Sequence, residues 1–68
     1  MRSELDIYAE MTLKRGEFWH RLYKKNGYSV YSAGYTNPVY RIFNANGKRV
    51  YTNTNYDATM IEFERLIE

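Results

Sequence analysis

Two arginines of this 68-residue chain occupy the same position of an internal repeat. Residues 21–32 read RLYKKNGYSVYS and residues 41–52 read RIFNANGKRVYT, so Arg21 and Arg41 each begin one copy. A guanidinium presents its donors in a planar fork that matches the oxygens of a phosphate or a carboxylate. The two arginines therefore fit a paired anion clamp. They fit equally well a cross-strand contact with Glu10, or solvated side chains that lie over tyrosine rings.

Aromatic side chains accompany these cations along the chain. They make up 18% of the residues, and eight of them are Tyr. Rings on a sheet with neighbouring cations are typical of single-strand nucleic-acid binders. Trp, Tyr and Arg also dominate the energetics of protein–protein interfaces. The candidate binding residues are the aromatic and basic side chains that we expect on one open sheet face: Trp19, Arg21, Tyr23, Lys25, Tyr28, Arg41, Phe43 and Lys48.

Catalytic and metal-binding residues are sparse in this sequence. His20 is the single histidine and there is no cysteine, so the side chains that usually hold zinc are missing. No serine or threonine is indicated as a nucleophile beside His20. The four glycines are isolated and form no phosphate-binding loop. We therefore expect a protein that is not an enzyme and that has no metal and no cofactor.

The repeat also predicts how the candidate residues are positioned. Each copy contains Asn-Gly, at residues 26–27 and 46–47, between arms of alternating apolar residues. This is the strongest local signal for a β-hairpin, because both turn residues tolerate a positive φ. A bulged three-residue loop would instead turn the following strand over. Two-residue turns give four cross-strand pairs: Leu22 with Tyr31, Tyr23 with Val30, Ile42 with Tyr51, and Phe43 with Val50.

The other segments are expected to extend these hairpins into a meander. Residues 5–13 have an apolar side chain at every second position, which predicts a first strand with one buried face. Residues 17–24 are expected as a strand, although their apolar spacing also fits a helix that ends at Asn26-Gly27. Further strands are predicted over residues 28–35, 39–44 and 48–53.

The last segment changes to a helical period. Met60, Ile61, Phe63 and Ile67 follow helical spacing, and Asp57 or Asn55 is a suitable N-cap. The sequence thus predicts a single α+β domain over residues 1–68. This domain is a five-stranded antiparallel β-meander, with the two Asn-Gly hairpins as an internal repeat and one C-terminal helix packed on one face. One helix leaves the other face of the sheet open, and that face would carry the candidate residues.

Positive charge is concentrated in the middle of the chain. The net charge is +2, but residues 14–49 contain eight Lys or Arg side chains and one acidic side chain, Glu17. The overall charge is well below that of a dedicated nucleic-acid-binding domain. We therefore expect a non-enzymatic module that binds a larger host protein, and we keep single-stranded DNA or RNA binding by the same face as the alternative.

The cellular setting is inferred from composition alone. The small size, the lack of Cys and the frequent Tyr, Asn and Lys are similar to those of small accessory proteins that bacteriophages make early in infection. This similarity favours an inhibitor or modulator of a host protein. No apolar run is long enough for a membrane span and no secretion signal begins the chain, so the predicted location is cytoplasmic. A homo-oligomer through the sheet face or an edge strand is also compatible with the pattern.

Overall fold

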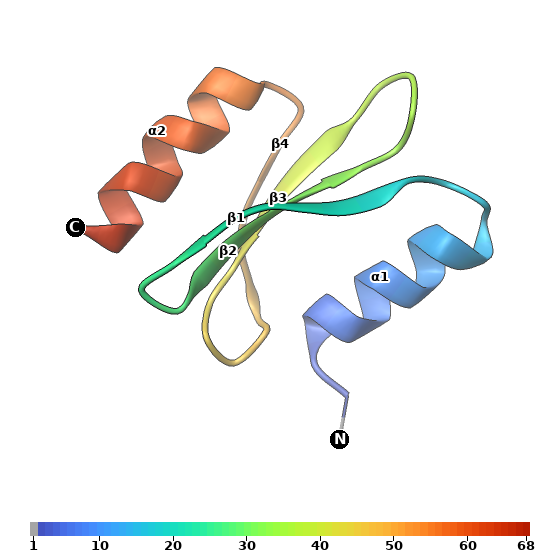
Figure 1. Cartoon of the computed structure of the whole chain (residues 1–68), viewed down its shortest axis with the longest axis horizontal. Coiled ribbons are helices and arrows are strands. Elements are labelled where there is room, and N and C mark those ends of the chain that lie inside the picture. Colours follow the sequence, from blue (N-terminus) through green and yellow to red (C-terminus); the bar gives the residue numbers. More distant parts are fainter. Residues whose placement is uncertain (1) are drawn as a thin grey trace.

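A four-stranded antiparallel sheet forms the middle layer of the molecule, and the computed structural model describes residues 2–68. The strands follow one another across the sheet in the order β1-β2-β3-β4. One helix lies on each side of this sheet (Figure 1). In chain order the elements are α1 (Glu4–Lys14), β1 (Trp19–Lys25), β2 (Tyr28–Ala33), β3 (Val39–Phe43), β4 (Arg49–Asn53) and α2 (Tyr56–Ile67).

The α+β class and the antiparallel sheet are confirmed, whereas the number of strands and helices is corrected. Residues 5–13 form α1 and not a fifth strand. Leu5, Tyr8, Ala9 and Thr12 turn toward the protein at the spacing of one helix face, and Thr12 is fully buried among them. Most residues of this segment also have high helix propensity. The alternation of apolar residues was therefore a misleading signal, and the predicted first strand does not form.

Both ends of α1 have well-defined caps. Ser3 and Asp6 form a capping box, in which each side chain accepts a hydrogen bond from the backbone amide of the other residue. At the other end, Gly16 N–H donates to the carbonyl oxygen of Leu13 and Glu17 N–H donates to that of Thr12. This is a Schellman motif, which places Gly16 at a φ of 75°. Gly16 thus ends α1 before the chain enters β1.

The first Asn-Gly hairpin has the predicted turn and an additional bulge. Asn26 and Gly27 both have positive φ, at 52° and 83°, and Tyr23 lies opposite Val30 as expected. Beyond that pair the register shifts, because Leu22 is an extra residue and Arg21 takes its place opposite Tyr31. The predicted pair of Leu22 with Tyr31 is therefore wrong.

The second hairpin contains two irregularities. Gly47 N–H donates to the carbonyl oxygen of Asn44 and Asn44 N–H donates to that of Lys48, so the turn is a three-residue loop with Gly47 at a φ of 74°. Phe43 then lies opposite Arg49, and the predicted pair with Val50 is wrong. Val50 is an extra residue that compensates for the loop, which restores the predicted pair of Ile42 with Tyr51.

The core on the α2 side is small and apolar. Val30 and Ile42 have no exposed surface, and Phe63 of α2 packs on them. Asn55 caps α2 by accepting a hydrogen bond from Ala58 N–H, which confirms one of the two expected N-caps. Ile61, which was expected on the inner stripe, is 69% exposed, and Leu66 packs against the core instead. α2 therefore joins β2, β3 and β4 into one unit.

Candidate binding surface

The sheet face under α1 carries most of the aromatic and basic side chains. Cross-strand neighbours share a face. The pairings align Lys24, Ser29, Phe43 and Arg49 in one row and Arg21, Tyr31, Arg41 and Thr52 in the next. Trp19 lies at the end of this face, opposite Ala33. We call it the basic–aromatic face, and its defining residues are Trp19, Arg21, Lys24, Tyr31, Arg41, Phe43 and Arg49.

The eight predicted binding residues are divided between the two faces of the sheet. Trp19, Arg21, Arg41 and Phe43 belong to the basic–aromatic face. Tyr28 packs against the core on the α2 side, and its strand partner Lys25 shares that side. The Tyr23 ring lies 6.4 Å from the Phe63 ring, which also places it there. Lys48 lies in the loop before β4.

Three members of this face were missed by the sequence analysis: Lys24, Tyr31 and Arg49. The bulge at Leu22 reverses the alternation of β1, so that Arg21 and Lys24 share a face and Tyr23 leaves it. The register between β2 and β3, which pairs Val30 with Ile42, assigns Tyr31 to the same face as Arg41. Neither feature follows from the Asn-Gly turns alone.

The rings of this face stack on one another. The Trp19 and Tyr31 rings are 4.9 Å apart and nearly parallel, and the Tyr31 ring meets Phe43 edge-on at 5.7 Å. Tyr8 of α1 contacts Phe43 from above, at 6.1 Å between ring centroids. Phe43 has no exposed surface as a result. An open aromatic face was predicted here, but α1 covers its centre (Figure 1).

Arg41 is the most unusual residue of this face. Its guanidinium lies over the Tyr8 ring at 4.5 Å, and that of Arg49 approaches the same ring at 5.5 Å. Nε and Nη1 of Arg41 are buried and have no hydrogen-bond partner among residues 2–68. Burial lowers the pKa of Arg41 below its usual value, and the nearby positive charges of Arg49 and Arg15 lower it further.

The other cations of this face also lack acidic partners. The ion pairs in the described part of the chain are Arg2–Glu10, Arg15–Glu17 and Arg65–Glu62. None of them includes Arg21, Lys24, Arg41 or Arg49. Glu4 of α1 is close to Arg49, but its carboxylate accepts a hydrogen bond from the Arg49 backbone amide at 3.2 Å. Four positive charges therefore share one side of the sheet without an opposite charge in contact.

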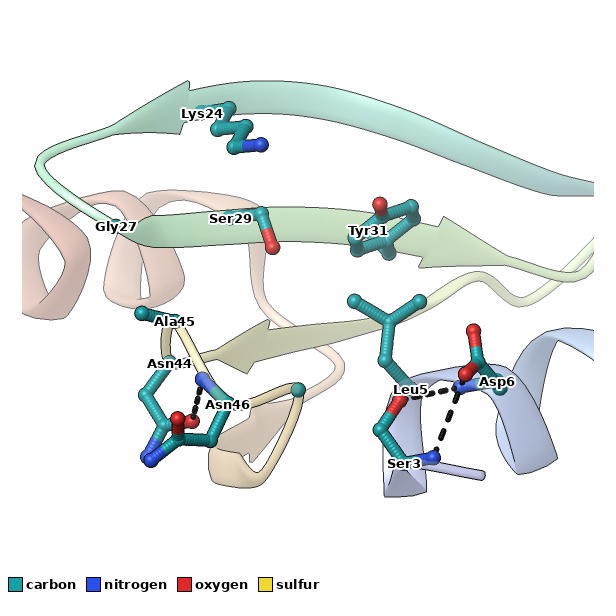
Figure 2. Close-up of a pocket in the computed structure, with 11 residues that line it drawn as sticks. Ser3, Leu5, Asp6, Lys24, Gly27, Ser29, Tyr31, Asn44, Ala45 and Asn46 are labelled. Atoms are coloured by element: carbon teal, nitrogen blue, oxygen red, sulfur yellow. Dashed lines mark hydrogen bonds between the residues drawn. The ribbon is translucent and has the colours of Figure 1, made fainter. Parts of the chain in front are cut away.

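A hollow opens where the basic–aromatic face emerges from beneath the N-terminal end of α1. It has a volume of about 370 Å³ and lies between α1, the β1–β2 hairpin and the β3–β4 loop (Figure 2). Its polar side chains include Lys24, Ser29 and Tyr31 on the sheet side. Ser29 is only 5% exposed, and its hydroxyl points into the hollow. The hollow therefore gives solvent access to the edge of the covered face.

Large apolar side chains of α1 are exposed among its charged residues. Ile7 and Met11 lie one turn apart on the side of α1 that faces away from the sheet. Leu13 is a further exposed apolar side chain near the C-terminal end of the helix. These three side chains are 42–59% exposed. We call Ile7, Met11 and Leu13 the apolar outer surface. Phe18 is also exposed, but its ring contacts His20 and Tyr35, each at 5.6 Å, and it is not part of this surface.

His20 has an exposed side chain on the edge strand β1. Its pair with Ser32 places it on the α2 side of the sheet, and its ring lies 5.6 Å from that of Phe18. Within residues 2–68, no three His, Asp or Glu side chains are grouped closely enough to hold a metal ion.

Comparisons with known proteins give no further assignment. The chain matches no protein-family model, no curated protein and no solved structure. Of the two helices in the described part of the chain, neither is long and apolar enough to cross a membrane.

Proposed function

We propose that this protein is a non-enzymatic module that binds a larger protein and modulates it. The observation that supports the proposal is the apolar outer surface, because a helix that already buries one face also presents large apolar side chains to water. Exposed apolar patches of this kind commonly mark protein interaction sites.

This proposal moves the binding site from the sheet to α1. The predicted anchors Trp19 and Phe43 stack with Tyr31 beneath α1, so they are not free to contact a partner while α1 is docked. The side chains of the apolar outer surface are already available. Lys14 and Arg15 lie next to them and are exposed. A partner with an apolar groove and an acidic rim would complement both features.

A pair of matched double variants tests this proposal. Ile7→Ser/Met11→Ser changes the apolar outer surface, whereas Val50→Ser/Ile61→Ser removes two exposed apolar side chains elsewhere. Tagged protein is used to capture partners from a nuclease-treated cell lysate, and circular dichroism confirms that each variant is folded. We expect the first variant to lose a specific partner and the second to retain it.

Three results would contradict the proposal. Equal capture by both variants would show that the apolar outer surface is not used. Loss of the partner only in the Val50/Ile61 variant would place the site elsewhere. Capture of only further copies of the same chain would show that this surface is an interface for self-association. Sedimentation at two protein concentrations would detect such self-association.

A further inference from the structure

We infer that the basic–aromatic face is a binding surface for single-stranded nucleic acid, and that α1 covers it and must move for full access. This inference concerns the inner side of α1 and does not depend on the protein partner proposed for its outer side. It rests on three observations, namely the unpaired cations, the shallow packing of α1, and the hollow at its N-terminal end.

While α1 covers the basic–aromatic face, polar atoms and positive charges of that face have no partners. The buried Nε and Nη1 of Arg41 have no acceptor among the described residues, and a buried donor without a partner destabilises the closed arrangement. Arg49 lies close to the same Tyr8 ring, so two like charges are held together. A ligand that brings anionic oxygens to this place would relieve both penalties.

The packing of α1 on the sheet is shallow. Thr12 is the only residue of this 11-residue helix that is buried. Its other attachments are the Tyr8 contacts and two hydrogen bonds near its start, from Leu5 N–H to the Gly47 carbonyl oxygen and from Arg49 N–H to Glu4. The core around Val30, Ile42 and Phe63 contains no residue of α1. Displacement of α1 would therefore leave that core intact.

The surface beneath α1 suits a flexible chain of nucleotides. Trp19, Tyr31 and Phe43 would present ring faces on which bases stack. Arg21, Lys24, Arg41 and Arg49 are interleaved with these rings in neighbouring rows, where they would meet the phosphates. The combination of rings with cations favours nucleic acid over an acidic peptide, which would use the charges and leave the rings unoccupied.

The hollow provides the first contact while α1 is in place. Lys24, Ser29 and Tyr31 belong both to the wall of the hollow and to the side of the sheet that α1 covers (Figure 2). The Ser29 hydroxyl points into the hollow and Lys24 lines it on the β1 side, so the two side chains would together hold one phosphate. Leu5 of α1 forms the opposite wall, so a longer ligand would have to move α1 aside.

A reversible disulfide across the hollow tests the movement of α1. A Cβ atom added at Gly47 would lie 3.5 Å from Cβ of Leu5, which is at the short end of the range for a disulfide, but only 2.6 Å from Cβ of Ser3. All cysteine variants therefore also carry Ser3→Gly, which removes this clash and is well tolerated at an N-cap. The chain has no other cysteine, so Leu5→Cys/Gly47→Cys can form only this intramolecular bond. Binding of a fluorescent oligothymidylate is measured at low salt before and after reduction, with the two single-cysteine variants as controls for the substitutions themselves. We expect reduction to tighten binding about tenfold, because phosphate contacts dominate such affinities.

The unmodified protein and matched charge variants give an independent readout. Trp19 is the single tryptophan, so base stacking on this face should quench its fluorescence. Arg21→Gln/Lys24→Gln removes two exposed cations of the face, and Lys14→Gln/Lys25→Gln removes two exposed cations outside it. The first pair should weaken binding about tenfold and the second only slightly, since the two pairs change the net charge equally.

Several results would overturn the inference, and none depends on the protein partner. They are failure of the unmodified protein to bind at low salt, unchanged Trp19 fluorescence on binding, and equal weakening by the two charge variants. Equal affinity of the oxidised and reduced disulfide variant for the oligothymidylate would show that α1 does not block the basic–aromatic face. Competition by polyglutamate as strong as that by the oligonucleotide would show that the face attracts any polyanion, including an acidic peptide.

Discussion

The guanidinium of Arg41 lies 4.5 Å from the centroid of the Tyr8 ring, and this contact fixes α1 above the sheet. Tyr8→Leu removes the ring and should lower the free energy of unfolding by about 1 kcal/mol, since a partly buried cation–π contact has this magnitude. Tyr8→Phe retains the ring and is the matched control. Urea unfolding followed by Trp19 fluorescence measures both. An equal loss in Tyr8→Phe would mean that the hydroxyl, and not the ring, holds the helix.

The first hairpin turn is tied to the end of the last helix. The Asn26 side-chain amide donates to the carbonyl oxygen of Ile67 at 2.6 Å, while Asn26 itself adopts a φ of 52°. Asn26→Gly tolerates this backbone conformation and loses only the hydrogen bond, so we expect a loss of about 1 kcal/mol in stability. Asn26→Ala should lose about 1 kcal/mol more, because a Cβ atom is unfavourable at positive φ. Equal unfolding midpoints for the two variants would contradict this separation.

The N-caps of the two helices should have different effects on stability. Asn55→Ala removes the cap of α2, and α2 completes the core, so global stability should fall by about 1 kcal/mol. Ser3→Ala removes the corresponding bond at α1. We expect this variant chiefly to speed amide hydrogen exchange within α1, with a smaller change in global unfolding. A larger global loss for Ser3→Ala would show that α1 is part of the cooperative core.

Tyr23 and Tyr56 form a hydrogen-bonded pair on the α2 side that responds to alkaline pH. Their hydroxyl oxygens are 3.2 Å apart, and the bond to Tyr23 raises the pKa of Tyr56. A raised pKa means that the folded protein favours the protonated hydroxyl. The contribution is therefore complete below the usual pKa of tyrosine and is lost as the pH rises through the raised value. Tyr23→Phe should lower the pKa of Tyr56, as measured by ultraviolet absorbance during alkaline titration. An unchanged titration curve would mean that the hydrogen bond is absent in solution.

The sequence was most informative where the backbone itself imposes a conformation. Asn26-Gly27 requires positive φ at two successive residues, and this predicted both the turn and the pair of Tyr23 with Val30. The helical spacing of Met60, Phe63 and Ile67 likewise predicted α2, whose apolar face packs on the sheet. These signals are local, so they do not depend on how the rest of the chain is arranged.

The errors arose where two patterns compete or where packing decides. Apolar and polar residues alternate over residues 5–13 as they do in a strand. However, Ser3 and Asp6 form a capping box, and this pattern indicates the start of a helix. The bulge at Leu22 has no comparable local signal. It is stabilised by contacts that turn both Leu22 and Tyr23 toward the α2 side, where Leu22 packs on the core and the Tyr23 ring lies near Phe63. The composition of the basic–aromatic face depends on that bulge. Three of the eight predicted binding residues, Tyr23, Lys25 and Tyr28, were therefore assigned to the wrong side.

Both extra residues of the sheet, Leu22 and Val50, lie in its outermost strands. An outer strand with regular unpaired amides and carbonyls is a template on which further chains can add and grow into fibrils. A bulge interrupts that regular spacing and increases the local twist, so an incoming strand cannot pair along the full length. The bulges at Leu22 and Val50 should therefore protect the protein from fibril growth. Deletion of either residue would remove this protection from the outer strand that contains it, β1 or β4.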